Sequence, residues 1–172
     1  MKYKKHYFTI ILVLFTSLCF SQNKFETYET EVFKIQYPMN WSLQTSNDFG
    51  ASFAISSPLL NGEDKFSENV NLIVQDLKGQ NVSFDQYVNI SKSQLKSLPK
   101  SEFLESKRFR KENLEYQSII FKAFLQERKL KIQQIYIIKN NFAYVLTFTA
   151  LEKDYDLYKN ISDKVLNSFK LK

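Results

Sequence analysis

Histidine and cysteine, on which most nucleophilic, redox and transition-metal chemistry in proteins depends, occur once each in this sequence. They are His6 and Cys19, and both lie within the first 20 residues. Ser-His-Asp and Cys-His systems require His, thiol redox chemistry requires Cys, and most zinc, copper or haem sites require one or the other. Once the beginning of the chain is removed, none of this chemistry is available to the remainder.

The beginning of the chain is typical of an export signal. Lys2, Lys4 and Lys5 form a basic start without an acidic residue, and an apolar run of 13 residues follows from Phe8 to Phe20. A signal-peptide core has about this length, whereas a membrane-spanning helix needs about 20 residues. The pattern predicts export and no stable membrane span in the mature form.

Small side chains mark the expected cleavage point. Cys19 and Ser21 occupy the −3 and −1 positions for cleavage before Gln22. We therefore expect residues 1–21 to be a signal peptide, 22–172 to form a single domain, and the product to be periplasmic or secreted.

Cys19 also permits a lipoprotein interpretation, in which it would be the lipid-bearing first residue of the mature chain. Lipoprotein sites have a small residue immediately before the Cys, whereas Leu18 is bulky. The soluble product is the preferred prediction, and lipidation is the alternative.

The charge balance argues against nucleic acid as a partner. The formal net charge is +6, with 24 basic and 18 acidic residues. Removing the three lysines of the signal leaves 21 basic residues and a net charge of +3, which is ordinary for a soluble domain. The glycines at positions 50, 62 and 79 are too few and too scattered for a phosphate-binding loop.

Carboxylates are the remaining candidates for chemistry. Asp48, Glu63, Asp64 and Glu68 cluster around loops and could offer oxygen ligands to a hard cation. Their spacing fits no calcium-loop pattern, so solvated loop acids are the preferred interpretation. No two carboxylates show a spacing that indicates a glycosidase-type pair. We therefore expect neither an enzyme nor a cofactor, and we assign no catalytic, cofactor-binding or metal residue.

Two basic runs offer a surface for an anionic membrane or an acidic partner. Basic residues at hairpin ends also protect sheet edges from unwanted pairing, which is the preferred interpretation. The runs consist of Lys107, Arg108, Arg110 and Lys111, and of Arg128, Lys129 and Lys131.

Apolar alternation predicts that most of the chain forms β-strands. In residues 142–149, Phe142, Tyr144, Leu146 and Phe148 face one way and Ala143 and Val145 the other, which indicates a sheet covered on both faces. Trp41 is expected to pack beneath the sheet as an anchor. The expected strands are 32–37, 41–44, 51–57, 69–77, 103–110, 116–126, 130–139 and 142–150.

Two helices are predicted to supply the cover. Ser83 and Gln86 have the spacing of a capping box, and Pro99 ends the helix that they begin. A second helix is expected over residues 154–169. The fold class is therefore α+β, with helices flanking a central antiparallel sheet of about six strands in an α/β/α sandwich.

Several stretches of the chain together resemble the PsbP-like, Mog-type domain family. They are Phe33–Pro38 (FKIQYP) with Trp41, Asn69–Asp76 (NVNLIVQD), Ser83–Tyr87 (SFDQY), Ala143–Ala150 (AYVLTFTA) and Asn167–Lys170 (NSFK). The resemblance extends over roughly residues 28–171, and its strength lies in the order and spacing of the motifs.

This resemblance implies the same α/β/α sandwich and a role in binding or assembly. Family members include a photosynthetic accessory subunit, a Ran-binding protein and bacterial envelope proteins, so the fold does not define one function. Manganese and calcium binding in plant members involves His, which the mature chain lacks.

Two functions are preferred at this point, and an enzyme that uses carboxylates alone ranks third. The first is an exported, non-catalytic binding or assembly module whose partner is another envelope protein. The alternative is a carrier that holds a small apolar or amphipathic ligand between sheet and helix, and it requires a cavity of several hundred Å³ there.

Overall fold

Strands dominate the fold, as the alternation of apolar residues predicts. The computed structural model describes residues 24–45, 50–111 and 113–172, and within these residues it contains ten strands and two helices. The elements are β1 (Phe25–Glu29), β2 (Phe33–Pro38), β3 (Ser42–Gln44), β4 (Phe53–Ser56), β5 (Asn69–Asp76), α1 (Phe84–Lys96), β6 (Glu102–Lys111), β7 (Leu114–Leu125), β8 (Arg128–Lys139), β9 (Phe142–Leu151), α2 (Tyr155–Ser168) and β10 (Lys170–Leu171).

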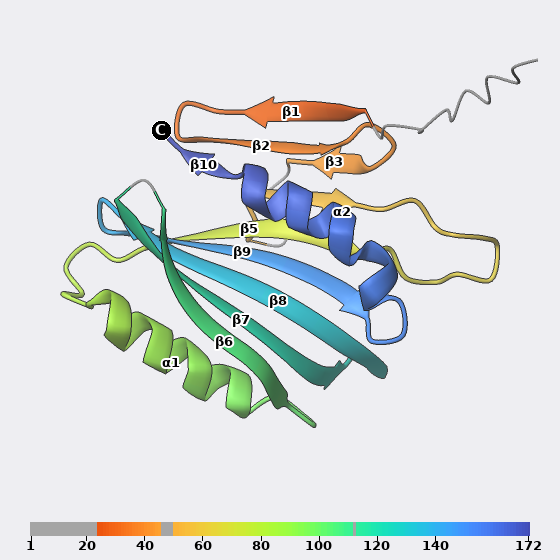
Figure 1. The fold of residues 1–172 in the computed structure, drawn as a ribbon. Helices are drawn as coiled ribbons and strands as arrows, with labels where there is room; N and C mark the ends of the chain where they lie inside the picture. Colours follow the sequence, from red (N-terminus) through yellow and green to blue (C-terminus); the bar gives the residue numbers. More distant parts are fainter. Residues whose placement is uncertain (1–23, 46–49, 112) are drawn as a thin grey trace, which may run out of the picture.

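Seven strands form the central antiparallel sheet, in the order β3-β4-β5-β9-β8-β7-β6 (Figure 1). Strands β6 to β9 form a meander, because each is joined to the next by a short turn. Between β8 and β9, Asn140 and Asn141 have φ angles of 53° and 61°, the left-handed geometry that a two-residue hairpin needs and that Asn tolerates. The predicted sheet and this predicted turn are confirmed.

A second, smaller sheet was not predicted. Strand β2 pairs with β1 on one side and with β10 on the other, so that Lys34 lies opposite Lys170 and Phe33 lies opposite Leu171. Strand β10 has only two residues, and its pairing partner lies more than 130 positions away. No local pattern could therefore have indicated it.

The central sheet is covered on both faces, which confirms the prediction from β9. Helix α2 lies between the two sheets, and α1 lies on the opposite face of the central sheet (Figure 1). Leu146 and Phe148 belong to the core on the α2 side, whereas Val145 belongs to the core on the α1 side. The architecture is therefore an α+β sandwich with two apolar cores.

The helix boundaries also follow the sequence signals. The hydroxyl of Ser83 accepts a hydrogen bond from the Gln86 amide at 3.2 Å, and the Gln86 side chain accepts one from the Ser83 amide at 2.9 Å. The predicted capping box of α1 is thus confirmed. In α2, Tyr158 and Val165 of the predicted apolar stripe are buried.

Candidate binding groove

The acidic residues singled out in the sequence do not converge on a cation site. Asp48 lies outside the described residues. The Asp64 carboxylate accepts hydrogen bonds from the backbone amides of Leu60 at 2.9 Å and Phe66 at 3.1 Å, and these bonds hold its pKa below the usual range. Within residues 24–45, 50–111 and 113–172, no three His, Cys, Asp or Glu side chains are grouped closely enough to hold a metal ion. Asp64 therefore shapes its own loop.

Glu68 is the exception among these acids, because its side chain is only 1% exposed. Its carboxyl accepts a hydrogen bond from the Ser57 hydroxyl at 3.4 Å. Burial raises the pKa of the Glu68 carboxyl, backbone amides oppose this rise, and the charges of Asp154 and Asp64 add to it. The Ser57 amide also donates to the Glu68 carbonyl at 2.8 Å, so the pair closes the loop between β4 and β5.

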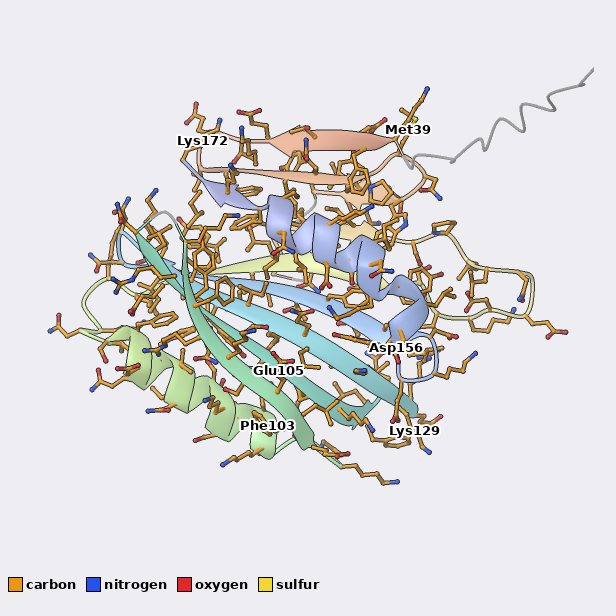
Figure 2. The ribbon with its side chains drawn as sticks, in the orientation of Figure 1. Met39, Phe103, Glu105, Lys129, Asp156 and Lys172 are labelled. Atoms are coloured by element: carbon orange, nitrogen blue, oxygen red, sulfur yellow. The ribbon has the colours of Figure 1, made fainter. Side chains whose placement is uncertain are left out.

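The two basic runs lie at opposite ends of the central sheet. Lys111 pairs with the first residue of β7 and Arg128 with its last. Lys172 lies at the end of the molecule where β10 meets β2. Figure 2 shows Lys129 far from it. A single flat patch made of both runs, as the membrane interpretation implied, is therefore not formed.

Several of these basic side chains have intramolecular partners. Arg108 pairs with Asp85 at 2.5 Å, Arg110 with Glu115 at 3.0 Å, and Lys131 with Asp156 at 3.2 Å. The first run lies on β6, an edge strand of the central sheet. This placement fits the protection of a sheet edge by charged side chains.

An uncharged, largely apolar surface groove of about 560 Å³ lies between the β4–β5 loop and the first half of α2. Its nine lining residues carry no charged side chain. They are Asn40, Trp41, Pro58, Leu59, Leu60, Leu157, Tyr158, Asn160 and Ile161.

Leucines form the outer walls of this groove and are open to solvent. Leu59 and Leu60 are 52% and 55% exposed on the loop, and Leu157 is 66% exposed on α2. Met39, 54% exposed, directly precedes the lining residue Asn40. Grouped exposure of large apolar side chains beside polar ones marks sites that contact proteins, membranes or ligands.

The inner wall of the groove is aromatic and rigid. Trp41 is 5% exposed, and its ring meets that of Tyr158 edge-on with centroids 6.1 Å apart. The expectation that Trp41 anchors the core is thus confirmed, although one side of it also lines the groove. Burial raises the pKa of the Tyr158 hydroxyl, which interacts with Ser57 and Glu68 behind the groove.

Local structure explains how the loop presents its leucines. Pro58 follows β4 and cannot donate a backbone hydrogen bond to continue the sheet. The Asn61 side chain accepts hydrogen bonds from the amides of Glu63 and Asp64, which folds the far part of the loop on itself. The loop extends beside the N-terminal end of α2 (Figure 1). Leu59 and Leu60 are thereby placed opposite Leu157.

The sequence prediction did not assign these leucines to a site. Two signals were available. Leu59-Leu60 is an apolar pair inside a loop, and Leu157 lies on α2 outside the stripe of Tyr158, Ile161 and Val165 that faces the core. Neither signal indicates that the two segments lie opposite each other.

Between the central sheet and α2 there is no room for a carried ligand in the described residues. The hollow between the central sheet and the C-terminal part of α2, lined by Ile135, Leu146, Leu166 and Phe169 among others, measures about 20 Å³. That is room for about one water molecule. On this side of the sheet, the space that the carrier alternative needs is occupied by the core. On the other side, between β5 and α1, a hollow of about 260 Å³ is lined mainly by polar side chains, among them Gln75, Gln80 and Gln94, which suits an apolar ligand poorly.

Comparison with solved structures identifies the fold of the chain. The solution structure of cyanobacterial PsbP (CyanoP) from Synechocystis sp. PCC 6803 superposes with a TM-score of 0.67 at 11% identity, over 87% of this chain and 94% of that one. The chain has the PsbP/Mog fold. The predicted α/β/α sandwich is therefore confirmed.

Two further structures show how widely this PsbP/Mog fold occurs. LpqN, involved in cell envelope biogenesis of Mycobacterium tuberculosis, superposes with a TM-score of 0.69 at 11% identity, over 86% of this chain and 90% of that one. The Saccharomyces cerevisiae Ran-binding protein Mog1p gives a TM-score of 0.57 at 9% identity, over 86% and 95%. At these identities the likeness concerns the fold.

Sequence comparison adds no further relative. Neither a protein-family model nor a curated protein matches the chain. Among the residues that the structure describes, neither helix is long and apolar enough to cross a membrane.

Proposed function

We propose that this chain is an exported, non-catalytic binding module of the bacterial cell envelope, and that the groove beside α2 holds an apolar segment of another envelope protein. The observation that carries the proposal is the grouping of Leu59, Leu60 and Leu157, all more than half exposed, around one hollow. Exposing three leucines in this way costs solubility, and a partner that covers them recovers the free energy of burial.

Three further observations support the proposal. The basic start and apolar run of residues 1–21 are typical of an export signal. Mog1p, which shares the fold, is a Ran-binding protein, and LpqN is involved in cell envelope biogenesis. The groove lacks charged lining residues, so it offers apolar contact rather than acid–base chemistry.

Site-specific photocrosslinking in intact source cells tests this function. A photoreactive residue is placed at Leu60 or Leu157, and at Ile90 as the control, an apolar residue on α1 that is also more than half exposed. The purification tag follows Lys172, which lies at the opposite end of the small sheet from Met39 (Figure 2). We expect both groove positions, and not position 90, to crosslink to the same envelope protein.

Two results would contradict the proposal. Equal crosslinking from all three positions would show that the groove has no special role. A hydrolytic activity that a single carboxylate substitution abolishes would show that the domain is catalytic.

A further inference from the structure

Most of the charged residues in the segments that line the groove are acidic. The β4–β5 loop contributes Glu63 and Asp64, and the residue before α2 is Asp154. The Asp64 carboxylate remains ionised at neutral pH, because backbone amides hold its pKa below the usual range. The segments beside the groove therefore carry negative charge.

Asp64 lies directly at the groove wall, because its carboxylate accepts a hydrogen bond from the amide of the lining residue Leu60 at 2.9 Å. The charges of Asp64 and Asp154 both raise the pKa of Glu68, and those of Glu68 and Asp64 raise that of Tyr158, which lines the groove. Asp64 and Glu68 are thus the acids that stand nearest to Tyr158 and Leu60 in this part of the groove.

The basic residues of the same segments compensate only partly. Lys153 pairs with Asp154 at 3.2 Å, and the Lys65 ammonium donates to the Gly62 carbonyl at 3.1 Å. Lys159, between the lining residues Tyr158 and Asn160, pairs with Asp163. Residues 58–68 and 153–161 together thus contain three lysines and five carboxyls, those of Glu63, Asp64, Glu68, Asp154 and Asp156. The sign is opposite to that of the whole chain, whose formal net charge is +6.

We propose that the occupant of the groove is an amphipathic protein segment that places apolar side chains between Leu60 and Leu157 and a lysine or arginine beside Asp64 and Asp154. This inference rests on the proposed function and adds the chemistry of the partner. A helix with apolar residues at i, i+3, i+4 and i+7 has the form that such grooves bind. An anionic lipid surface would be repelled by the carboxylates at the rim.

Trp41 provides a direct reporter of occupancy. It is the only tryptophan in the sequence, and it lines the groove. A segment that enters the groove changes the environment of one side of the indole, so the fluorescence of the unlabelled protein reports binding. No added probe is needed.

The test uses two synthetic peptides that share one leucine pattern and differ only in carrying lysines or glutamates on the polar face. We expect the lysine peptide to bind about threefold to tenfold more tightly at low salt, the effect of one or two exposed ion pairs. The difference should shrink as salt is raised, because exposed charges are screened.

Matched variants assign the effect to the groove. Glu63→Gln combined with Asp154→Asn removes two charges without a change of shape and leaves Asp64, which also holds the loop, in place. This double variant should reduce the preference for lysine, whereas Glu127→Gln, at the distant β7–β8 turn, should not. Leu60→Ser should weaken both peptides, whereas Ile90→Ser should weaken neither. Circular dichroism shows that each variant is folded.

Three outcomes would overturn the inference. Equal binding of the two peptides would remove the cationic requirement and leave the groove as a purely apolar site, so the proposed function would survive. Absence of any Trp41 response to either peptide would reject an amphipathic occupant. A Trp41 response to phosphatidylglycerol vesicles, and not to the lysine peptide, would assign the groove to a membrane surface.

Discussion

At the scale of single residues, Glu68 is unusual because an ionisable carboxyl group is buried. A carboxylate in the interior loses its hydration, and in compensation it receives the Ser57 hydroxyl and backbone amides. Glu68 also closes the loop between β4 and β5, because its backbone carbonyl accepts a hydrogen bond from the Ser57 amide. Glu68 thus holds the loop that carries Leu59 and Leu60 against α2.

Replacing Glu68 with Gln should remove a pH dependence of stability. The pKa of Glu68 in the folded protein lies above its ordinary value of 4.5. Between that value and the raised pKa the folded state binds more protons than the unfolded state, so this group makes the free energy of unfolding fall as pH rises. The slope is at most about 1.4 kcal/mol per pH unit for one proton.

Urea unfolding of both proteins across this pH range measures the effect. We expect the stability of Glu68→Gln relative to the natural protein to increase as pH rises from 4.5 through the raised pKa. Exposed acids whose pKa is lowered, such as Asp64 and Glu152, make the free energy of unfolding rise with pH. They do so equally in both proteins, so their contribution cancels when the two are compared. Parallel curves would mean that Glu68 ionises normally in the folded state.

At the scale of elements, α1 shows how far a local signal reaches. The two reciprocal hydrogen bonds of Ser83 and Gln86 satisfy amides that an α-helix leaves free at its beginning. Both bonds join residues three positions apart, so nothing distant is needed to form them. The cap was therefore predictable, and so was the beginning of α1.

Substituting Ser83 with Ala should lower the free energy of unfolding by about 1 kcal/mol, the usual cost of losing an N-cap hydroxyl. The control is Ser93→Ala, which removes an exposed mid-helix hydroxyl that bonds to the Asn89 carbonyl at 3.0 Å. Since Ala favours helix interiors, that change should be neutral or slightly stabilising. Chemical denaturation compares the two, and similar losses would contradict a capping role.

At the scale of the whole molecule, the central sheet joins two cores that lie on its opposite faces. Strand β9 contributes to both, through Leu146 on the α2 side and Val145 on the α1 side. A chain without disulfides depends on such packing, because no covalent link restricts its unfolded state. The exposed leucines of the groove are not part of this arrangement.

Leu146→Ala and Leu157→Ala should separate packing from binding. Leu146 is 1% exposed, so its truncation should lower the free energy of unfolding by about 2–5 kcal/mol. Unfolding should remain a single cooperative transition with a lower midpoint. Leu157 is 66% exposed, so its truncation should change stability by less than about 0.5 kcal/mol. Thermal and urea unfolding measure both. A large loss for Leu157→Ala would show that the groove residue supports the fold.

The local patterns of the sequence were sufficient to predict most elements and the fold class. Apolar alternation in β9 indicated a sheet covered on both faces, and Asn140-Asn141 indicated a hairpin turn. Each of these signals acts between residues that are neighbours on a strand, a turn or a helix. They are therefore readable without knowledge of the rest of the molecule.

Only the tertiary structure decided the small sheet and the groove. Strand β10 forms because Leu171 reaches Phe33, and the groove forms because Trp41, Leu60 and Leu157 meet from three distant segments. Contacts between residues that lie far apart in the sequence depend on how all the intervening elements pack. The residue types that could bind were visible in the sequence, but their meeting in one hollow was a property of the fold.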